Sequence, residues 1–241
     1  MFAALDDAGH HLVAPPAGRL ARARGRILAF TDADCLVTRR WLDELVAPFA
    51  DPAVGGVGGR TETYRPVTPA ERHAARIQHL DAERHLAHPT FPFAPTANAA
   101  FRREVFDAIG GFDPAFPWGE PIDFCKRLVR DTGFRLAYAP RAVVFHRARA
   151  STADFCRQQW GYGYSQALLC AKYGDEVRWG PRQEWGARWG VWRAGLDLPL
   201  ALLRRARRAG ALEASWLEFK RQMARRRGFT AAVRERGLKL S

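Results

Sequence analysis

Short apolar runs alternate with amphipathic segments between residues 26 and 146, which predicts strands joined by helices. Patterns typical of strands occur at 26–31, 54–63, 96–101, 133–138 and 142–146. Helical periodicity occurs at 38–50, 69–88, 102–109 and 121–131. We expect Thr38 to cap the first of these helices. This order predicts an α/β fold with a mostly parallel sheet and helices on both faces.

The pattern becomes helical after residue 151, where aromatic residues recur beside arginines. Trp185, Trp189 and Trp192 follow helical spacing there. The sequence therefore predicts a partial α/β domain at 1–150 and a basic, Trp-rich helical region at 151–241. Tryptophan on one helix face and arginine on the other suits a membrane interface, and the same pattern suits aromatic residues docked on the α/β core.

Composition and charge narrow the function classes. The chain has 241 residues, a formal net charge of +13 and four cysteines without a Cys-x-x-Cys pair, so neither a zinc pattern nor a disulfide framework is predicted. We expect a cytoplasmic protein, because no signal peptide and no apolar run of membrane-spanning length is visible. A basic chain can meet nucleic acid, but the sequence contains no nucleic-acid-binding motif, which argues against that partner.

Two aspartates, Asp32 and Asp34, end the first predicted strand. Residues i and i+2 of a strand project to the same side, so both carboxylates leave the strand together. Such oxygen ligands suit Mg²⁺ or Mn²⁺ held with substrate phosphates. An Asp at a strand end can also cap the next helix, and Asp-x-Asp also occurs as a phosphatase nucleophile. The His and acidic residues of 69–88, including His73, His79 and His85, are expected on a solvated helix face. The alternative is a metal pair of Asp81 and His85, which stand at i and i+4.

Several motifs follow the aspartates in a fixed order. They are Asn98, Gly110-Gly111-Phe112-Asp113, Trp118-Gly119-Glu120-x-x-Asp123-Phe-Cys-x-Arg127 and His146. With the Asp-x-Asp pair (the DxD motif), they make residues 17–170 resemble the family 2 glycosyltransferases of the GT-A fold, which is Rossmann-like. The resemblance is more specific than the acid pair alone, because the order and spacing of several motifs agree.

The resemblance implies a role for each motif. Asp32 and Asp34 would hold the metal and the nucleotide-sugar diphosphate, and His146 would face them from a late strand. Glu120 and Asp123 would supply the catalytic base. The remaining motif positions, Asn98, Gly111, Trp118 and Arg127, would bind substrate. Independently of the resemblance, the i, i+4 spacing of Asp123 and Arg127 predicts that they pair on the helix at 121–131.

Two departures from the family pattern affect the prediction. The family's acidic motif usually reads Gly-Glu-Asp-x-Asp, and Pro121 stands where the usual base would be. The family's first strands, which hold the nucleotide, normally precede the Asp-x-Asp pair, whereas only about 31 residues precede Asp32 here. We therefore expect a member truncated at its N-terminus, without its first strands and with a C-terminal helical extension.

The resemblance thus predicts a metal-dependent glycosyltransferase of hexosyltransferase type. It would move a sugar from a nucleotide-diphosphate donor to a hydroxyl acceptor, such as a lipid-linked or envelope glycan. The basic C-terminal helices would rest on an anionic membrane surface, as in a peripheral protein on the inner face of the cell membrane. The alternative is a catalytically impaired GT-A remnant that serves as a membrane-surface or protein interaction module.

Overall fold

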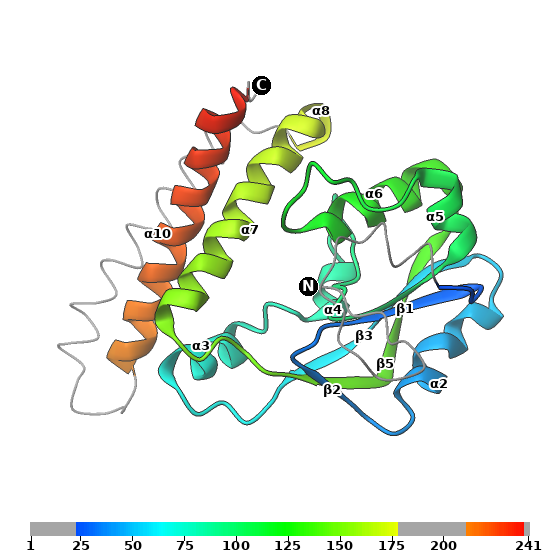
Figure 1. Ribbon diagram of the computed structural model, residues 1–241, viewed down its shortest axis with the longest axis horizontal. Helices are drawn as coiled ribbons and strands as arrows, with labels where there is room; N and C mark the ends of the chain where they lie inside the picture. Colours follow the sequence, from blue (N-terminus) through cyan, green and yellow to red (C-terminus); the bar gives the residue numbers. More distant parts are fainter. Residues whose placement is uncertain (1–22, 178–210, 239–241) are drawn as a thin grey trace. The chain divides into compact units, whose positions relative to one another are not determined.

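The computed structural model describes residues 23–177 and 211–238 (Figure 1). The strands are β1 (Ile27–Thr31), β2 (Cys35–Val37), β3 (Val54–Thr63), β4 (Asn98–Arg102) and β5 (Arg135–His146). The helices are α2 (Trp41–Val46), the 3-10 helix η1 (Ala47–Ala50), α3 (Pro69–Ile77), α4 (Ala82–Leu86), α5 (Arg103–Ile109), α6 (Glu120–Thr132), α7 (Thr152–Lys172), α8 (Gly174–Val177) and α10 (Ala211–Arg236). Trp185, Trp189 and Trp192 lie outside the described residues.

The chain divides into two compact units. The first holds the sheet and consists of residues up to 65, 78–115 and 120–148. The second consists of 66–77, 116–119 and the residues from 149 onward, and it contains α3, α7 and α10.

The described strands form one sheet in the order β1-β4-β3-β5-β2. β3 and β5 are parallel, whereas the other neighbouring pairs are antiparallel. The predicted α/β class with helices flanking the sheet is confirmed, but the expected mostly parallel arrangement is corrected to a mixed sheet. Alternating strands and helices do not fix strand direction, because mixed sheets use the same alternation.

The strand β5 joins two segments that the sequence predicted as separate strands around Pro140. Its register against β3 shifts between Ala139, which faces Gly59, and Val143, which faces Arg60. Proline has no N–H group to donate to a neighbouring strand, and the shift leaves Pro140 outside the paired positions. The strand therefore continues to its end at His146.

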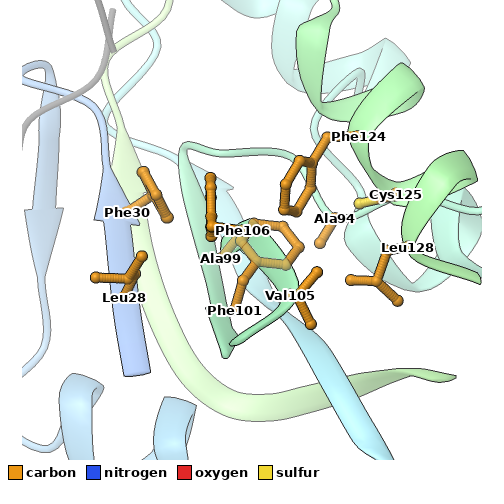
Figure 2. Close-up of a cluster of buried hydrophobic side chains, with 10 residues drawn as sticks. All are labelled: Leu28, Phe30, Ala94, Ala99, Phe101, Val105, Phe106, Phe124, Cys125 and Leu128. Atoms are coloured by element: carbon orange, nitrogen blue, oxygen red, sulfur yellow. The ribbon is translucent and has the colours of Figure 1, made fainter. Parts of the chain in front are cut away.

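Side chains on the two faces of the sheet form two separate cores. In β1, Leu28 and Phe30 enter the first core, while Ala29 packs against the second, as alternation along a strand requires. Figure 2 shows the first core, which consists of Leu28, Phe30, Ala94, Ala99, Phe101, Val105, Phe106, Phe124, Cys125 and Leu128. It lies between the sheet and the helices α5 and α6. Helix α2 closes the second core through Trp41 and Leu45.

The glycine-rich sequence of β3 makes room for side chains of the same unit. A Cβ atom on Gly56 would lie 2.7 Å from carbons of both Phe101 and Leu136. A Cβ on Gly59 would overlap the side-chain amide of Asn98. The close approach that these glycines permit is therefore used by side chains of the first unit itself.

In the second unit, helices α7 and α10 pack closely along each other. Ser151 caps α7, because its Oγ accepts a hydrogen bond of 3.0 Å from the backbone N–H of Asp154. The closest approach involves Gly163 of α7 and Gly228 of α10, since a Cβ at either position would overlap the backbone of the other helix. Among the described helices, none is long and apolar enough to cross a membrane.

Two polar residues of α3, Glu71 and His73, are buried, which corrects the expectation of a solvated face at these positions. His73 is only 4% exposed, and its Nε2 lies 3.3 Å from Oε2 of Glu218 in α10. Glu71 is 8% exposed, and its carboxylate accepts hydrogen bonds from the backbone N–H groups of Val67 and Thr68. These polar groups therefore hold the start of α3 and its contact with α10.

Candidate functional site

Asp32 and Asp34 lie in the tight turn that joins β1 to β2. The backbone N–H of Cys35 donates to the carbonyl oxygen of Asp32 at 3.0 Å, and the N–H of Arg147 donates to that of Asp34 at 2.8 Å. The first bond closes the turn, and the second connects the turn to the residue that follows β5. The carboxylates therefore stand where β1, β2 and the last residues of β5 meet.

His146 completes a three-residue cluster with the aspartates. It is the last residue of β5, faces Cys35 across the β2 pairing, and is 4% exposed. Its Nε2 lies 3.4 Å from Oδ1 of Asp34, and one ligand atom from each of Asp32, Asp34 and His146 lies within 4.8 Å of the others. The structure thus brings together the three residues that the sequence predicted as metal ligands.

The donor set of this cluster fits a divalent metal of the magnesium or manganese type. Two carboxylates and one imidazole offer oxygen and nitrogen atoms, which suit such ions. The neighbouring Cys35 is not part of the cluster, and its Sγ donates a hydrogen bond of 3.7 Å to the carbonyl oxygen of Ala97. The cluster therefore has no soft sulfur ligand, which a typical zinc or iron–sulfur site would use.

A second histidine, His79, supports the cluster, whereas the sequence predicted it on a solvated helix face. The ring of His79 packs edge-on against the ring of His146, with centroids 6.2 Å apart and planes at 84°. The carbonyl oxygen of His79 accepts a hydrogen bond of 2.9 Å from Nε2 of His85. Burial lowers the pKa of His85, although the hydrogen bond to His79 opposes this shift. His79 and His85 thus restrict the position of the His146 ring.

A surface cavity of about 240 Å³ adjoins the cluster. It is lined by Ala33, Asp34, Cys35, Leu36, Tyr64, Phe145 and Arg147. Asp34 belongs both to this lining and to the Asp–Asp–His cluster. Sequence reasoning missed Tyr64 and Arg147, whose only signal is that each directly follows the end of a predicted strand.

Asn98 lies inside the sheet rather than on its surface. It is fully buried, and its Oδ1 accepts a hydrogen bond of 2.8 Å from Nε1 of Trp41. Its Nδ2 donates to the carbonyl oxygens of Arg60 and Ala142 at 2.9 and 2.7 Å. In the sheet register Asn98 faces Thr31, the residue before Asp32. The side chain therefore connects β4 to α2, β3 and β5, and β4 in turn pairs with β1, the strand that precedes Asp32.

Asp123 and Arg127 form the i, i+4 pair that the sequence predicted on α6. Oδ2 of Asp123, which has no exposed surface, accepts a hydrogen bond of 2.8 Å from Nε of Arg127. The other guanidinium nitrogens donate to the carbonyl oxygens of Ile109 and Gly111, each at 2.6 Å. Gly111 has a φ of +76°, a conformation that glycine adopts without a steric cost. The pair thus ties α6 to the turn after α5.

Glu120 is the first residue of α6 and is half-buried. Burial raises the pKa of its carboxyl above the ordinary value, outweighing a hydrogen bond from its own backbone N–H. Pro121, in the position of the missing family aspartate, occupies the first turn of the helix, where a proline is readily accommodated. Among the predicted acidic residues of this motif, Glu120 alone keeps a partly accessible carboxylate.

Trp118 belongs to the second unit and is 37% exposed. Its ring packs against those of Trp160 and Tyr164, with centroid distances of 5.4 and 5.8 Å. Its carbonyl oxygen accepts a hydrogen bond from the hydroxyl of Ser165. The exposed part of the indole is a flat apolar surface of the kind that can stack on a sugar ring.

Comparison with known proteins agrees with this fold. Residues 9–163 match the family described as "Glycosyltransferase like family 2". The pre-mycofactocin glycosyltransferase of Mycobacterium tuberculosis is 33% identical over 175 residues, which cover 69% of this chain and 37% of that protein. The glycosyltransferase AglE of Haloferax volcanii is 28% identical over 153 residues, which cover 61% of this chain and 47% of AglE. The chain spans less than half the length of these curated relatives.

A solved structure shares the fold. The mannosyltransferase PcManGT from Pyrobaculum calidifontis, solved in complex with GDP-Man and Mn²⁺, aligns with a TM-score of 0.55 and 21% sequence identity. The alignment covers 91% of this chain and 65% of that one. This likeness confirms the predicted GT-A fold.

Proposed function

The chain belongs to the glycosyltransferase-like family 2, and from this premise we propose that it transfers a sugar from a nucleotide-diphosphate donor to a hydroxyl acceptor. The observation that carries the proposal is the convergence of Asp32, Asp34 and His146 within 4.8 Å at one end of the sheet. The structural relative that binds GDP-Man and Mn²⁺ supports a hexose donor and a divalent ion.

Asp32, Asp34 and His146 would hold Mg²⁺ or Mn²⁺. The ion would supply Lewis-acid stabilisation of the negative charge that develops on the departing nucleoside diphosphate. The His79 ring would keep the His146 imidazole in place, and Asn98 would hold the strands beneath Asp32. The protein residues thus contribute a fixed arrangement of ligand atoms, which is the usual contribution of a protein to such a site.

Glu120 is our candidate for the general base. A hydroxyl acceptor must lose its proton as it attacks the sugar, and a carboxylate with a raised pKa accepts that proton more effectively near neutral pH. Asp123 has no exposed surface and already accepts a hydrogen bond from Arg127. We therefore assign Asp123 and Arg127 to positioning of α6 and of the turn at Gly111.

Trp118 would bind the acceptor through the exposed part of its indole. The acceptor would be a glycan or a lipid-linked saccharide, since both offer hydroxyl groups and flat apolar sugar faces. Packing against Trp160 and Tyr164 limits the freedom of the Trp118 ring, which reduces the entropy lost on binding. In the first unit, Arg127 and Gly111 would support substrate binding through the turn after α5, which the Arg127 guanidinium holds.

A peripheral position on the cytoplasmic face of a membrane is the second part of the proposal. In α10, Trp216 is 44% exposed, stacks with Phe219, and lies 4.8 Å from Nζ of Lys220. Arg226 and Arg227 on the same helix are exposed. Exposed aromatic and basic side chains on one helix favour contact with anionic lipid headgroups.

The proposal is tested by incubating the protein with Mn²⁺ and a panel of nucleotide sugars and measuring nucleoside diphosphate release. We expect release from at least one donor, and its loss in the His146→Ala variant. His88→Ala is the matched control, because His88 is exposed and its Nδ1 accepts hydrogen bonds from the nearby backbone N–H groups of Thr90 and Phe91. Binding to anionic liposomes without turnover of any donor would favour the alternative of an impaired interaction module.

A further inference from the structure

Two arginines gather on one tyrosine beside the Asp–Asp–His cluster. The guanidinium carbons of Arg65 and Arg147 lie 5.4 and 5.8 Å from the ring centre of Tyr64. The ring itself is fixed to the end of β5, because the backbone N–H of Tyr64 donates to the carbonyl oxygen of His146 at 2.8 Å. The Tyr64 ring thus attracts two guanidinium groups close to His146, a predicted metal ligand.

The backbone holds both arginines in place. The N–H of Arg147 donates to the carbonyl oxygen of Asp34, so its position is coupled to the turn that carries the aspartates. Arg65 has a φ of +37°, in the left-handed region that residues other than glycine adopt at an energetic cost. Such backbone strain is concentrated at functional sites.

The nearby cavity gives Arg147 a binding surface. Tyr64 and Arg147 line it together with Asp34, and Leu36 and Phe145 add an apolar wall. A ligand in this cavity would meet the cluster at Asp34 and a guanidinium at Arg147. Glu62 lies on β3, two residues before Tyr64, and forms an ion pair of 2.7 Å with Arg60.

Charge balance identifies the kind of ligand. The carboxylates of Asp32 and Asp34 cancel the charge of a bound divalent ion, so the cluster with its ion leaves the charge of a diphosphate largely uncompensated. A guanidinium forms paired, charge-assisted hydrogen bonds with phosphate oxygens. The geometry points to a phosphate-binding site adjoining the metal cluster, formed by Arg147 and Arg65, whose guanidinium groups lie near the Tyr64 ring. This inference rests on the proposed function.

The phosphate could come from two sources that share this chemistry. One is the diphosphate of the nucleotide donor and its leaving group, and the other is the phosphate of a lipid-linked acceptor. Inorganic pyrophosphate with Mn²⁺ represents the first source. Phosphatidylcholine vesicles that contain a polyprenyl phosphate represent the second.

The test is calorimetric titration of the full chain with each probe, using Arg147→Ala, Arg147→Lys, Tyr64→Ala and Tyr64→Phe. We expect Arg147→Ala to weaken binding of one probe by about tenfold or more, because a charge-assisted hydrogen bond is lost. Tyr64→Phe keeps the ring and should bind like the wild type, whereas Tyr64→Ala should approach Arg147→Ala. Arg147→Lys should bind with intermediate affinity, because it keeps the charge without the planar fork.

A matched control is Arg141→Ala. Arg141 is an exposed arginine of β5 that pairs with Glu44 at 2.9 Å, and its loss should leave binding of both probes unchanged. Weaker binding of pyrophosphate assigns the site to the donor, and weaker binding of the vesicles alone assigns it to the acceptor. Unchanged affinity of Arg147→Ala for both probes would overturn the inference.

The two proposals fail in different ways. If no donor is turned over but pyrophosphate binding still depends on Arg147, the phosphate site stands and sugar transfer is rejected. If sugar is transferred equally well by Arg147→Ala and both probes bind it normally, sugar transfer stands and the phosphate site is rejected.

Discussion

The Nε2 atom of His146 lies 3.4 Å from Oδ1 of Asp34, although the two residues come from opposite ends of the sheet domain's sequence. The contact depends on the pairing of β2 with β5, in which Cys35 faces His146. Because the strand ends meet there, a residue that follows β1 and a residue that ends β5 can act on one ion. Substitutions at His79, Glu120, Asp123 and Glu218 test this arrangement and the stability of the fold.

His79 should tune metal affinity without being a ligand. We expect His79→Ala to weaken Mn²⁺ binding by about tenfold, because residues that orient a metal ligand typically have effects of this size. His79→Phe keeps a ring against His146 and should bind nearly as the wild type does. Mn²⁺ titration followed by electron paramagnetic resonance measures both variants, with His88→Ala as control. An equal loss in the Phe and Ala variants would contradict the packing role.

Glu120 should determine the acidic limb of the pH–rate profile. The base acts when deprotonated, and burial raises the pKa of Glu120 above its ordinary value of 4.5, so transfer should rise with pH through this raised pKa. Glu120→Gln should lower kcat by about 10²–10⁴-fold and leave the metal affinity unchanged. Glu104→Gln, on the exposed side of α5, is the control. Full activity of Glu120→Gln would exclude Glu120 as the base.

Asp123 should matter mainly for stability. Asp123→Asn removes the charge that pairs with Arg127, and breaking a buried ion pair costs about 3–5 kcal/mol. Asp131→Asn on the same helix breaks the exposed pair with Arg130 and should change the free energy of unfolding by less than about 0.5 kcal/mol. Urea unfolding measures both. A stable Asp123→Asn variant with no transfer activity would instead indicate a catalytic role.

Glu218 should make the second unit sensitive to acid. Burial alone would raise the pKa of its carboxyl, but hydrogen bonds from His73 and Arg221 outweigh burial and hold the pKa below the ordinary value. A depressed pKa stabilises the fold above the unfolded-state value of about 4.5, and this stability is lost as the pH falls further. Glu218→Gln should lower the free energy of unfolding at pH 7 by about 1.5–3 kcal/mol.

The same variant provides the comparison for acid unfolding. Below pH 4.5 the wild type should lose stability more steeply than Glu218→Gln, which has no carboxylate to protonate at this position. Glu235→Gln, an exposed site on α10, should follow the wild type. Parallel stability curves for wild type and Glu218→Gln would show that the contact with His73 contributes nothing to the acid response.

Local patterns in the sequence predicted much of the fold. The run at 54–63 is β3, the glycines after 109 end α5 with Gly110 at a φ of +76°, and the spacing of Asp123 and Arg127 forms the expected pair. These features depend on residues within about one helical turn of each other. The Asp–Asp–His cluster was predicted from the resemblance to a known family. Such a resemblance indicates which residues far apart in the sequence act at one site, whereas hydrophobic periodicity does not.

Features that depend on distant parts of the chain were missed. Thr38 does not cap α2, because its hydroxyl donates to the carbonyl oxygen of Val143 on β5 at 3.1 Å. His73 is buried because α10 supplies Glu218 as its partner. Tyr64 and Arg147 come together because β3 and β5 end side by side. None of these partners lies near its residue in the sequence.

The central claim is that Asp34 binds a divalent metal with Asp32 and His146, and Mn²⁺ binding to the purified chain tests it most directly. Electron paramagnetic resonance of free Mn²⁺ gives the affinity of the wild type, of Asp34→Asn and of Asp43→Asn, an exposed control on α2. The account predicts that Asp34→Asn loses affinity by at least about tenfold, whereas Asp43→Asn binds as the wild type does. Equal Mn²⁺ affinity in all three proteins would contradict it.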